Sequence, residues 1–228
     1  MVRGRDWLWV ATILGASVLH AGPPGPAKPG MQLPLAPDKA RYFPEALRRQ
    51  ILTCPGRRAD LPPMTVMDEF QDGWFSEQLA AAAEPSLAKL AETGPSSGRS
   101  VVRFTWLPSF DHSVTVRLEW APSGDMHLAA RMLSGAGGYA PGAVKQKVDR
   151  DLTEGERAAV NKLFASLLLW RQPAALCDMG LDGAEWLFEG TDSAGYHFVK
   201  RWSPNNGAVK EAGLAMLKLT GWHFKDIY

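Results

Sequence analysis

Ionisable side chains of several chemical types gather in the segment from residue 182 to residue 204. Asp182 precedes a predicted strand that contains Glu189, and the next predicted strand contains His197, Arg201 and Trp202. A carboxylate, an imidazole and a guanidinium within one hairpin-like unit could bind a polar ligand or take part in hydrolysis. Alternatively, Glu189 and Arg201 could simply pair across the two strands, which would contribute about 0.2–1 kcal/mol.

A glycine-rich loop at residues 135–142, with Tyr139 in its second half, is a second candidate binding element. The loop lacks the glycine spacing of dinucleotide-binding loops and the lysine–threonine ending of phosphate loops. The alternative is that its glycines serve tight turning of the backbone around Tyr139. We therefore expect no cofactor, and we place Tyr139 with Trp106, Tyr196 and Trp202 on the rim of a shallow ligand or partner surface.

The histidines do not predict a metal site. No two of them have the spacing of a helical metal motif, and His127 and His197 lie on predicted strands far apart in the sequence. A site made from these two with Glu189 is geometrically possible, but scattered strand histidines usually bind no metal. The successive Asp-His-Ser at residues 111–113 cannot form a catalytic triad, because the three members of a triad approach one another in space rather than in sequence.

Alternation along the predicted strands places charged side chains together on one face of the sheet. These side chains are Arg117, Glu119, His127, Arg131, Glu185 and Glu189. If helices cover only the opposite, apolar face, the charged groups are an ordinary solvent-exposed face with cross-strand pairs. The functional alternative is a shallow binding surface, since arginine and aromatic residues are enriched at interfaces.

The elements that must position these residues follow from the hydrophobic periodicity. Apolar residues recur at helical spacing over residues 69–83, behind a capping box at residues 153–156, and over residues 209–219. They alternate, as in strands, over residues 101–107, 113–120, 126–132, 184–189 and 196–202. The predicted fold class is therefore α+β, with a mostly antiparallel sheet of about five strands and helices packed on one face.

The N-terminal residues have the three parts of a secretory signal. Arg3 and Arg5 form a basic start, and residues 8–19 form an uncharged, mostly apolar run that is too short to span a bilayer. Ala21 then precedes a proline-rich stretch. Leu19 is larger than the residue usually found three before a cleavage site, so an uncleaved N-terminal membrane anchor is the alternative.

This pattern divides the chain into three parts. They are a signal peptide at residues 1–21, a Pro/Gly-rich spacer at residues 22–40 and a single globular α+β domain at residues 41–228. We predict no membrane span in the mature chain. Basic and acidic side chains are nearly equal in number, 25 against 24, which gives no electrostatic reason to bind nucleic acid.

The chain has two cysteines, Cys54 and Cys177. In an oxidising compartment such a pair is expected to form a disulfide rather than a metal site. Two separate buried thiols are the alternative.

Four strings also occur together in this chain. They are EPSL at residues 84–87, GGYAPG at residues 137–142, GLDGAEWLFEG at residues 180–190, and YH with RWSP within residues 196–204. In combination they resemble a family of short exported bacterial proteins of unknown function, over residues 74–219. The resemblance implies export and a single domain, and it supplies no catalytic residue.

These observations predict a periplasmic or secreted, non-catalytic binding or envelope-associated accessory protein, whose ligand is an unknown protein or small molecule. Its candidate binding residues are Tyr139, Asp182, Glu189, His197, Arg201 and Trp202. A hydrolase of cell-envelope or small-molecule substrates that uses residues 182–201 is one alternative. A membrane-tethered interaction domain is another, if the signal is not cleaved.

We predict that export removes residues 1–21, because the apolar run ends at a small residue followed by prolines. Intact-mass measurement on the protein from the periplasm should give the mass of residues 22–228. A mass that still includes Trp7 would contradict cleavage and favour the membrane-tethered form.

Overall fold

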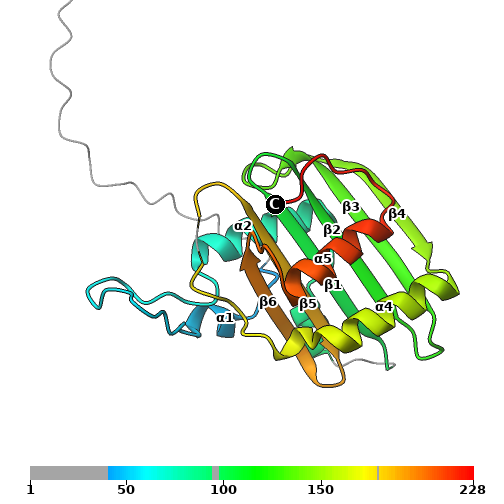
Figure 1. Ribbon diagram of the computed structural model, residues 1–228, viewed down its shortest axis with the longest axis horizontal. Coiled ribbons are helices and arrows are strands. Elements are labelled where there is room, and N and C mark those ends of the chain that lie inside the picture. The colour runs from blue at the N-terminus through cyan, green and yellow to red at the C-terminus, as the bar shows by residue number, and fades with distance from the viewer. Residues whose placement is uncertain (1–40, 94–97, 179) are drawn as a thin grey trace, which may run out of the picture. The chain divides into compact units, whose positions relative to one another are not determined.

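The computed structural model describes residues 41–93, 98–178 and 180–228, so the predicted signal peptide and spacer lie outside the described residues. Within these ranges, antiparallel strands form a six-stranded sheet in the order β4-β3-β2-β1-β5-β6 (Figure 1). The strands are β1 (Ser100–Pro108), β2 (His112–Trp120), β3 (Met126–Ala136), β4 (Val144–Asp151), β5 (Ala184–Asp192) and β6 (Gly195–Trp202). The predicted α+β class and antiparallel sheet are confirmed, with six strands in place of about five.

The helices of the described ranges lie before, between and after these strands. They are α1 (Glu45–Arg49), α2 (Glu69–Ala81), α3 (Leu87–Glu92), α4 (Glu154–Leu167) and α5 (Ala208–Leu219), with a short 3-10 turn at Leu169–Arg171. The capping box between Thr153 and Glu156 is present at the start of α4, and Asp68 and Gln71 form another at the start of α2. None of the helices in this part of the chain is long and apolar enough to cross a membrane.

Strand β4 is the strand that the sequence periodicity did not predict. It pairs with β3, with Val148 opposite Ala130, and forms one edge of the sheet. Its sequence, VKQKVDRD, is mostly charged and mostly exposed, so it shows no alternation of buried apolar residues. Charged side chains are typical of edge strands, because they oppose pairing with another chain.

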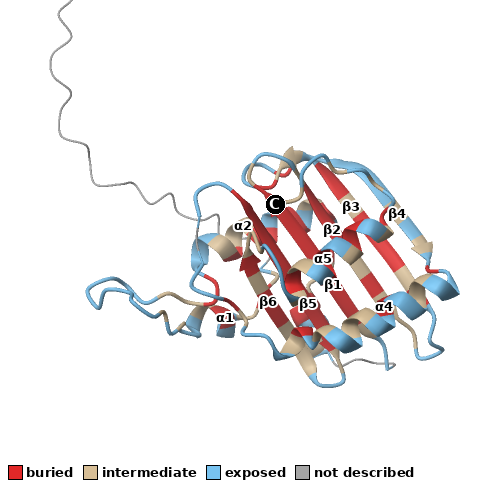
Figure 2. Cartoon of the chain, in the orientation of Figure 1, coloured by how far each residue is buried: buried red, intermediate tan, exposed pale blue. Residues whose placement is uncertain are grey.

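Helices pack on both faces of the sheet, which corrects the prediction of a single helical layer. On one face, α4 and α5 cover the larger core, which includes Phe104, Trp106, Trp186 and Phe188. On the other face, Leu107 and Leu187 belong to a smaller core with α1 and α2. Figure 1 shows α4 and α5 in front of the sheet and α2 behind it, and Figure 2 shows the buried strands between these layers.

A buried charge network lies between the sheet and the second helical layer. Arg103 of β1 is fully buried, and its Nη2 lies 2.5 Å from Oε2 of Glu189, the residue opposite it in β5. The same guanidinium donates to the carbonyl of Pro85 at 2.6 Å and lies 3.5 Å from Glu84. Burial opposes the charge of Arg103, but Glu189 and Glu84 keep its pKa above the usual value.

The predicted charged face is therefore solvent exposed only in part. The pairing register places Arg117, Glu119, His127 and Arg131 on the face of Glu185 and Glu189, as alternation predicted. Glu185 and Glu189 are nevertheless buried, because α2, α3 and the residues between them cover that end of the sheet. Alternation gives the face of a residue but not what covers the face.

The predicted disulfide between Cys54 and Cys177 is confirmed, with the two Cα atoms 5.6 Å apart. The two cysteines are 123 residues apart in the sequence. The bond joins the loop between α1 and α2 to the segment that leads into β5.

Replacing Glu189 with glutamine should lower the free energy of unfolding by about 3 kcal/mol, because Arg103 would stay buried without its main counter-ion. Urea unfolding measures the change. The matched control is Glu45→Gln, which removes an exposed ion pair with Arg49 and should cost less than about 1 kcal/mol. Equal losses in the two variants would show that the buried pair is not the anchor of this layer.

Candidate functional site

The six sequence-predicted binding residues separate into two groups. Tyr139, Asp182 and Trp202 line one cavity of about 610 Å³. Glu189, His197 and Arg201 do not line it, and they do not lie on one face of the sheet. The register pairs Glu189 with Phe198 and Arg201 with Trp186, so Glu189 and Arg201 are not cross-strand partners.

Each residue of the second group has a structural role of its own. Glu189 accepts hydrogen bonds from Arg103 and, at 2.9 Å, from the Tyr196 hydroxyl. His197 stacks on Trp170 and its Nε2 lies 3.0 Å from Asp192.

Arg201 lies on the same face of β6 as His197, opposite to Glu189. Its Nη1 donates to the carbonyl oxygens of Pro173 and Lys200, at 2.9 Å and 2.6 Å. Burial lowers the pKa of this guanidinium, and Asp178 opposes the shift. The structure therefore does not assemble Glu189, His197 and Arg201 into one site.

Two of the aromatic residues expected on the rim of a binding surface lie elsewhere. Trp106 is buried in the larger core, on the opposite face of the sheet from α2. Tyr196 directs its hydroxyl to Glu189 and packs against the smaller core. Tyr139 and Trp202 are the members of that set that line the cavity.

The cavity forms where the start of α2 faces the ends of β5 and β6. The segment between α1 and α2, the loops after β1 and β3, and the residues that lead into β5 complete its walls. We call it the Glu185 cavity. The lining residues with ionisable or aromatic groups include Trp74, Tyr139, Asp182, Lys200 and Trp202.

Glu185 is the buried ionisable group in this wall, with 4% of its surface exposed. Its Oε1 accepts a hydrogen bond from Gln71 Nε2 at 3.3 Å and lies 3.7 Å from Lys200 Nζ. Its Oε2 is buried and has no hydrogen-bond partner among the described residues. Burial raises the pKa of Glu185 to about 7; Lys200 opposes this shift, whereas Asp178 and Asp68 add to it.

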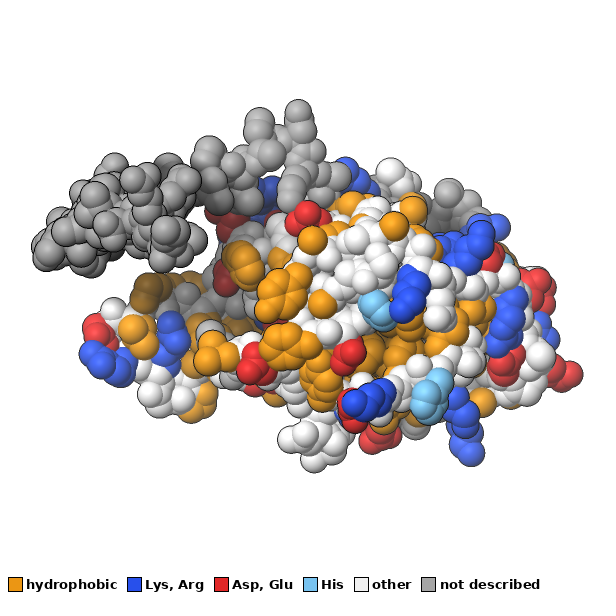
Figure 3. Space-filling model, turned by 90° about the horizontal axis from the view of Figure 1, so that it is seen from above, with side chains coloured by type: hydrophobic (Ala, Val, Ile, Leu, Met, Phe, Trp, Pro, Cys, Tyr) orange, Lys and Arg blue, Asp and Glu red, His pale blue; other side chains and the backbone are white. Residues whose placement is uncertain are grey.

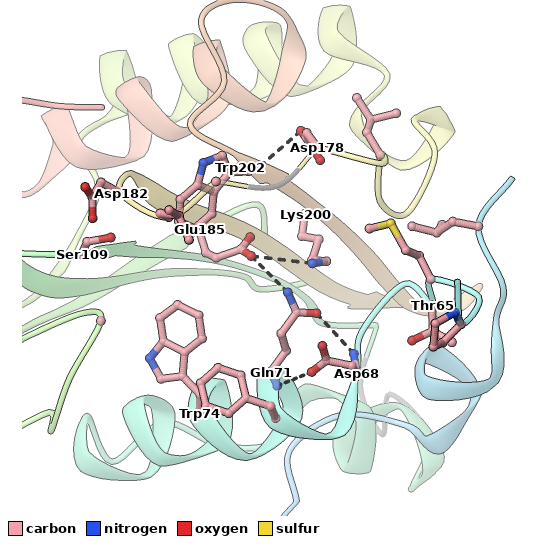
Figure 4. Close-up of a pocket in the computed structure, with 18 of the residues that line it drawn as sticks. Thr65, Asp68, Gln71, Trp74, Ser109, Asp178, Asp182, Glu185, Lys200 and Trp202 are labelled. Atoms are coloured by element: carbon pink, nitrogen blue, oxygen red, sulfur yellow. Dashed lines mark hydrogen bonds and ion pairs between the residues drawn. The ribbon is translucent and has the colours of Figure 1, made fainter. Parts of the chain in front are cut away.

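Two tryptophans lie on either side of this carboxyl. Figure 4 shows Glu185 between Trp202 of β6 and the α2 residues Gln71 and Trp74. Trp202 packs so closely against the backbone before β5 that a Cβ at Gly180 would overlap its indole. Glycine at this position therefore lets the ring lie against the main chain.

The glycine-rich loop is part of the same wall. Trp74 Nε1 donates to the carbonyl of Gly137 at 2.6 Å, and Gln78 Nε2 donates to the carbonyl of Tyr139 at 2.9 Å. A Cβ at Gly137 would lie 2.7 Å from the backbone of Leu107, so the loop approaches β1 as only glycine allows. The loop thus turns tightly, as its alternative interpretation expected, and the turn places Tyr139 at the cavity.

Large apolar side chains are unusually exposed around the cavity mouth. Phe70 is 74% exposed, Tyr139 65% and Leu181 96%, and Phe110 and Leu176 are also exposed lining residues. Figure 3 shows hydrophobic side chains gathered on the face seen from above, with acidic groups among them. A contiguous exposed apolar patch is typical of a site that binds a ligand or a partner.

The charges that line the cavity are mainly negative. Glu185, Asp68, Asp178 and Asp182 stand against Lys200 and Arg57. Arg57 is exposed, and its Nε and Nη2 donate to the carbonyl of Pro62. Among the described residues, no group of three or more His, Cys, Asp or Glu side chains is arranged to hold a metal ion.

These features define what the cavity can do chemically. Because its pKa is raised to about 7, the Glu185 carboxyl can donate a hydrogen bond in its protonated form and attract a cation in its ionised form. The tryptophan faces offer stacking surfaces, and the exposed rim offers apolar contact.

Only part of this site is identifiable from the sequence. Alternation places Glu185 on the charged face that was one possible binding surface, but Glu185 is not among the six candidate binding residues, and neither are Gln71, Trp74 and Lys200. The one available signal is the position of Glu185 at the start of a strand, directly after the turn at Asp182. Its neighbours Gln71, Trp74 and Lys200 come from other elements, and the sequence does not predict that these elements meet. The pairing of β5 with β6 places Glu185 opposite Trp202.

Comparison with models of known protein families found none that matches this chain, and comparison with curated proteins found no match. A function for this chain must therefore be inferred from the geometry of the cavity and from the sequence motifs.

The stability of the protein should depend on the ionisation of Glu185. Its folded pKa of about 7 is above its usual value of 4.5, so between these values the native state holds a proton that the unfolded chain has released. The free energy of unfolding of the wild type should therefore fall by about 3 kcal/mol, relative to Glu185→Gln, as pH rises through this window.

Urea unfolding at about pH 5 and about pH 8 measures this difference. The control is Glu156→Gln, because the Arg150 hydrogen bond lowers the pKa of Glu156 to about 2, outside the window. Parallel pH profiles for wild type and Glu185→Gln would contradict a raised pKa at Glu185.

Proposed function

We propose that this chain is an exported, non-catalytic binding protein that holds a small molecule in the Glu185 cavity. The observation that carries the proposal is the buried Glu185 carboxyl, with Oε2 unpartnered among the described residues, in the wall of an aromatic-lined cavity. Burying a carboxyl without full partners costs stability. A ligand that compensates this group would explain why it is there.

The dimensions and lining of the cavity support a small-molecule ligand. A volume of about 610 Å³ lies within the range of sites for small organic molecules. Such sites combine mostly apolar and aromatic walls with a few polar groups, as Trp74, Trp202, Glu185 and Lys200 do here.

The hydrolase alternative has less support from the geometry. It requires Glu189, His197 and Arg201 to act together near Asp182. Glu189 is held by Arg103 and Tyr196 on one face of the sheet, while His197 and Arg201 belong to the other face. Binding in the Glu185 cavity needs no such convergence.

A periplasmic or secreted location is the second part of the proposal. The Cys54–Cys177 disulfide supports an oxidising compartment, where such bonds form and persist. The predicted signal at residues 1–21 and the resemblance to exported bacterial proteins point in the same direction.

The uncharged fluorescent dye Nile red should bind the oxidised protein through the cavity's aromatic walls. Trp202→Ala should weaken this binding by about tenfold, because a stacking surface is lost. Leu214→Ala, an exposed apolar residue of α5 outside the cavity lining, should leave it unchanged. Fluorescence titration measures both affinities.

Two results would contradict the proposal. Failure of the folded wild type to bind Nile red would remove the evidence for an accessible apolar site. Equal weakening by Trp202→Ala and Leu214→Ala would show that the dye binds the general surface and not the cavity.

A further inference from the structure

We propose that the Glu185 cavity selects an organic ammonium ion that carries an apolar group, with Glu185 as its buried counter-ion. This inference rests on the proposed function, because it names the ligand class of the same cavity. Four observations carry it: the charge of the lining, the incomplete pairing of Glu185, the aromatic walls and the apolar rim.

The charge of the lining favours a cation. Among the described residues, four carboxylates line the cavity against two cationic side chains, and one of those, Arg57, bonds at the exposed rim. An anionic ligand would meet Glu185, Asp178, Asp182 and Asp68 together. Repulsion of this kind discriminates between ligands as strongly as attraction does.

Within the described part of the chain, the pairing of Glu185 leaves one of its two oxygens uncompensated. Gln71 and Lys200 both approach Oε1, while Oε2 has no partner among the described residues. Lys200 therefore compensates one side of the carboxyl only, at the long distance of 3.7 Å. A ligand ammonium group in the cavity would supply the missing compensation for the buried anion.

The aromatic walls favour an ammonium ion over a metal ion. Trp74 and Trp202 line the cavity on either side of Glu185 (Figure 4). The faces of tryptophan rings attract organic cations, and desolvated sites strengthen the attraction to about 2 kcal/mol or more. The exposed Phe70, Phe110 and Leu181 at the mouth offer contact for an apolar substituent of the same ligand.

The ionisation of Glu185 adds a pH dependence to this selection. The charged groups around its carboxyl are Lys200 of β6, Asp178 of the segment before β5 and Asp68 at the start of α2. Burial and the two aspartates favour the protonated form at low pH, and a bound cation would favour the ionised form. A cation should therefore bind more tightly as pH rises through 7, with release of a proton from Glu185.

Isothermal titration calorimetry on the oxidised protein tests the inference with three probes that share a phenyl ring. They are the cation benzyltrimethylammonium, the neutral benzyl alcohol and the anion benzenesulfonate. At about pH 8 the cation should bind at least about tenfold more tightly than the alcohol, and the anion more weakly than either.

Glu185→Gln should weaken the binding of the cation by about tenfold and leave that of the alcohol unchanged. Glu92→Gln, which changes an exposed glutamate of α3 outside the cavity, should change neither. Wild-type affinity for the cation should fall by about tenfold from about pH 8 to about pH 6, and Glu185→Gln should lose this dependence. The wild-type pH series needs no variant, so it decides the question even if Glu185→Gln does not fold.

The outcomes separate this inference from the proposed function. Equal affinity for the three probes, a preference for the anion, or pH-independent binding of the cation would overturn cation selection and leave a small-molecule site in place. No binding of any probe, together with no binding of Nile red, would overturn both.

Discussion

The Arg103–Glu189 ion pair is the interaction on which the second helical layer depends. Arg103 joins β1 to β5 through Glu189, and it joins the sheet to the segment before α3 through the carbonyl of Pro85. A fully buried guanidinium needs these acceptors, because an unpaired buried charge is costly. The pair therefore fixes the segment that follows α2, and α2 in turn carries Gln71 and Trp74 to the wall of the cavity.

The cavity exists because one end of α2 packs against the sheet through apolar side chains and the other end does not. Phe75 and Leu79 belong to the apolar core that also contains Leu107 and Leu187 of the sheet. One turn nearer the start of the helix, Gln71 contacts Glu185 instead, and Phe70 is largely exposed. The helix thus closes one end of the sheet tightly and leaves the other end open beside a buried carboxyl.

The sequence predicted the fold better than the site, for physical reasons. Alternation identified five strands because each buries apolar residues, whereas the charged edge strand β4 buries almost none. Glu185 and Glu189 occupy equivalent positions in the sequence pattern of β5, because both lie on the same face of the strand and each follows an apolar residue. They differ in the residue that lies opposite in a neighbouring strand, which is Trp202 for Glu185 and Arg103 for Glu189. Local hydrophobic periodicity does not predict which strands pair, so it does not distinguish the two carboxyl groups.

The Cys54–Cys177 disulfide lies at the border of the cavity, and this position links the cavity to the redox state of the surroundings. Leu52 and Met64 on one arm, and Leu176 and Asp178 on the other, are lining residues. The bond keeps these two chain segments close together, whereas without it they would be free to separate. Reduction of the bond would remove the covalent constraint that places Leu52 and Met64 beside Leu176 and Asp178, so the shape of this part of the rim depends on the disulfide.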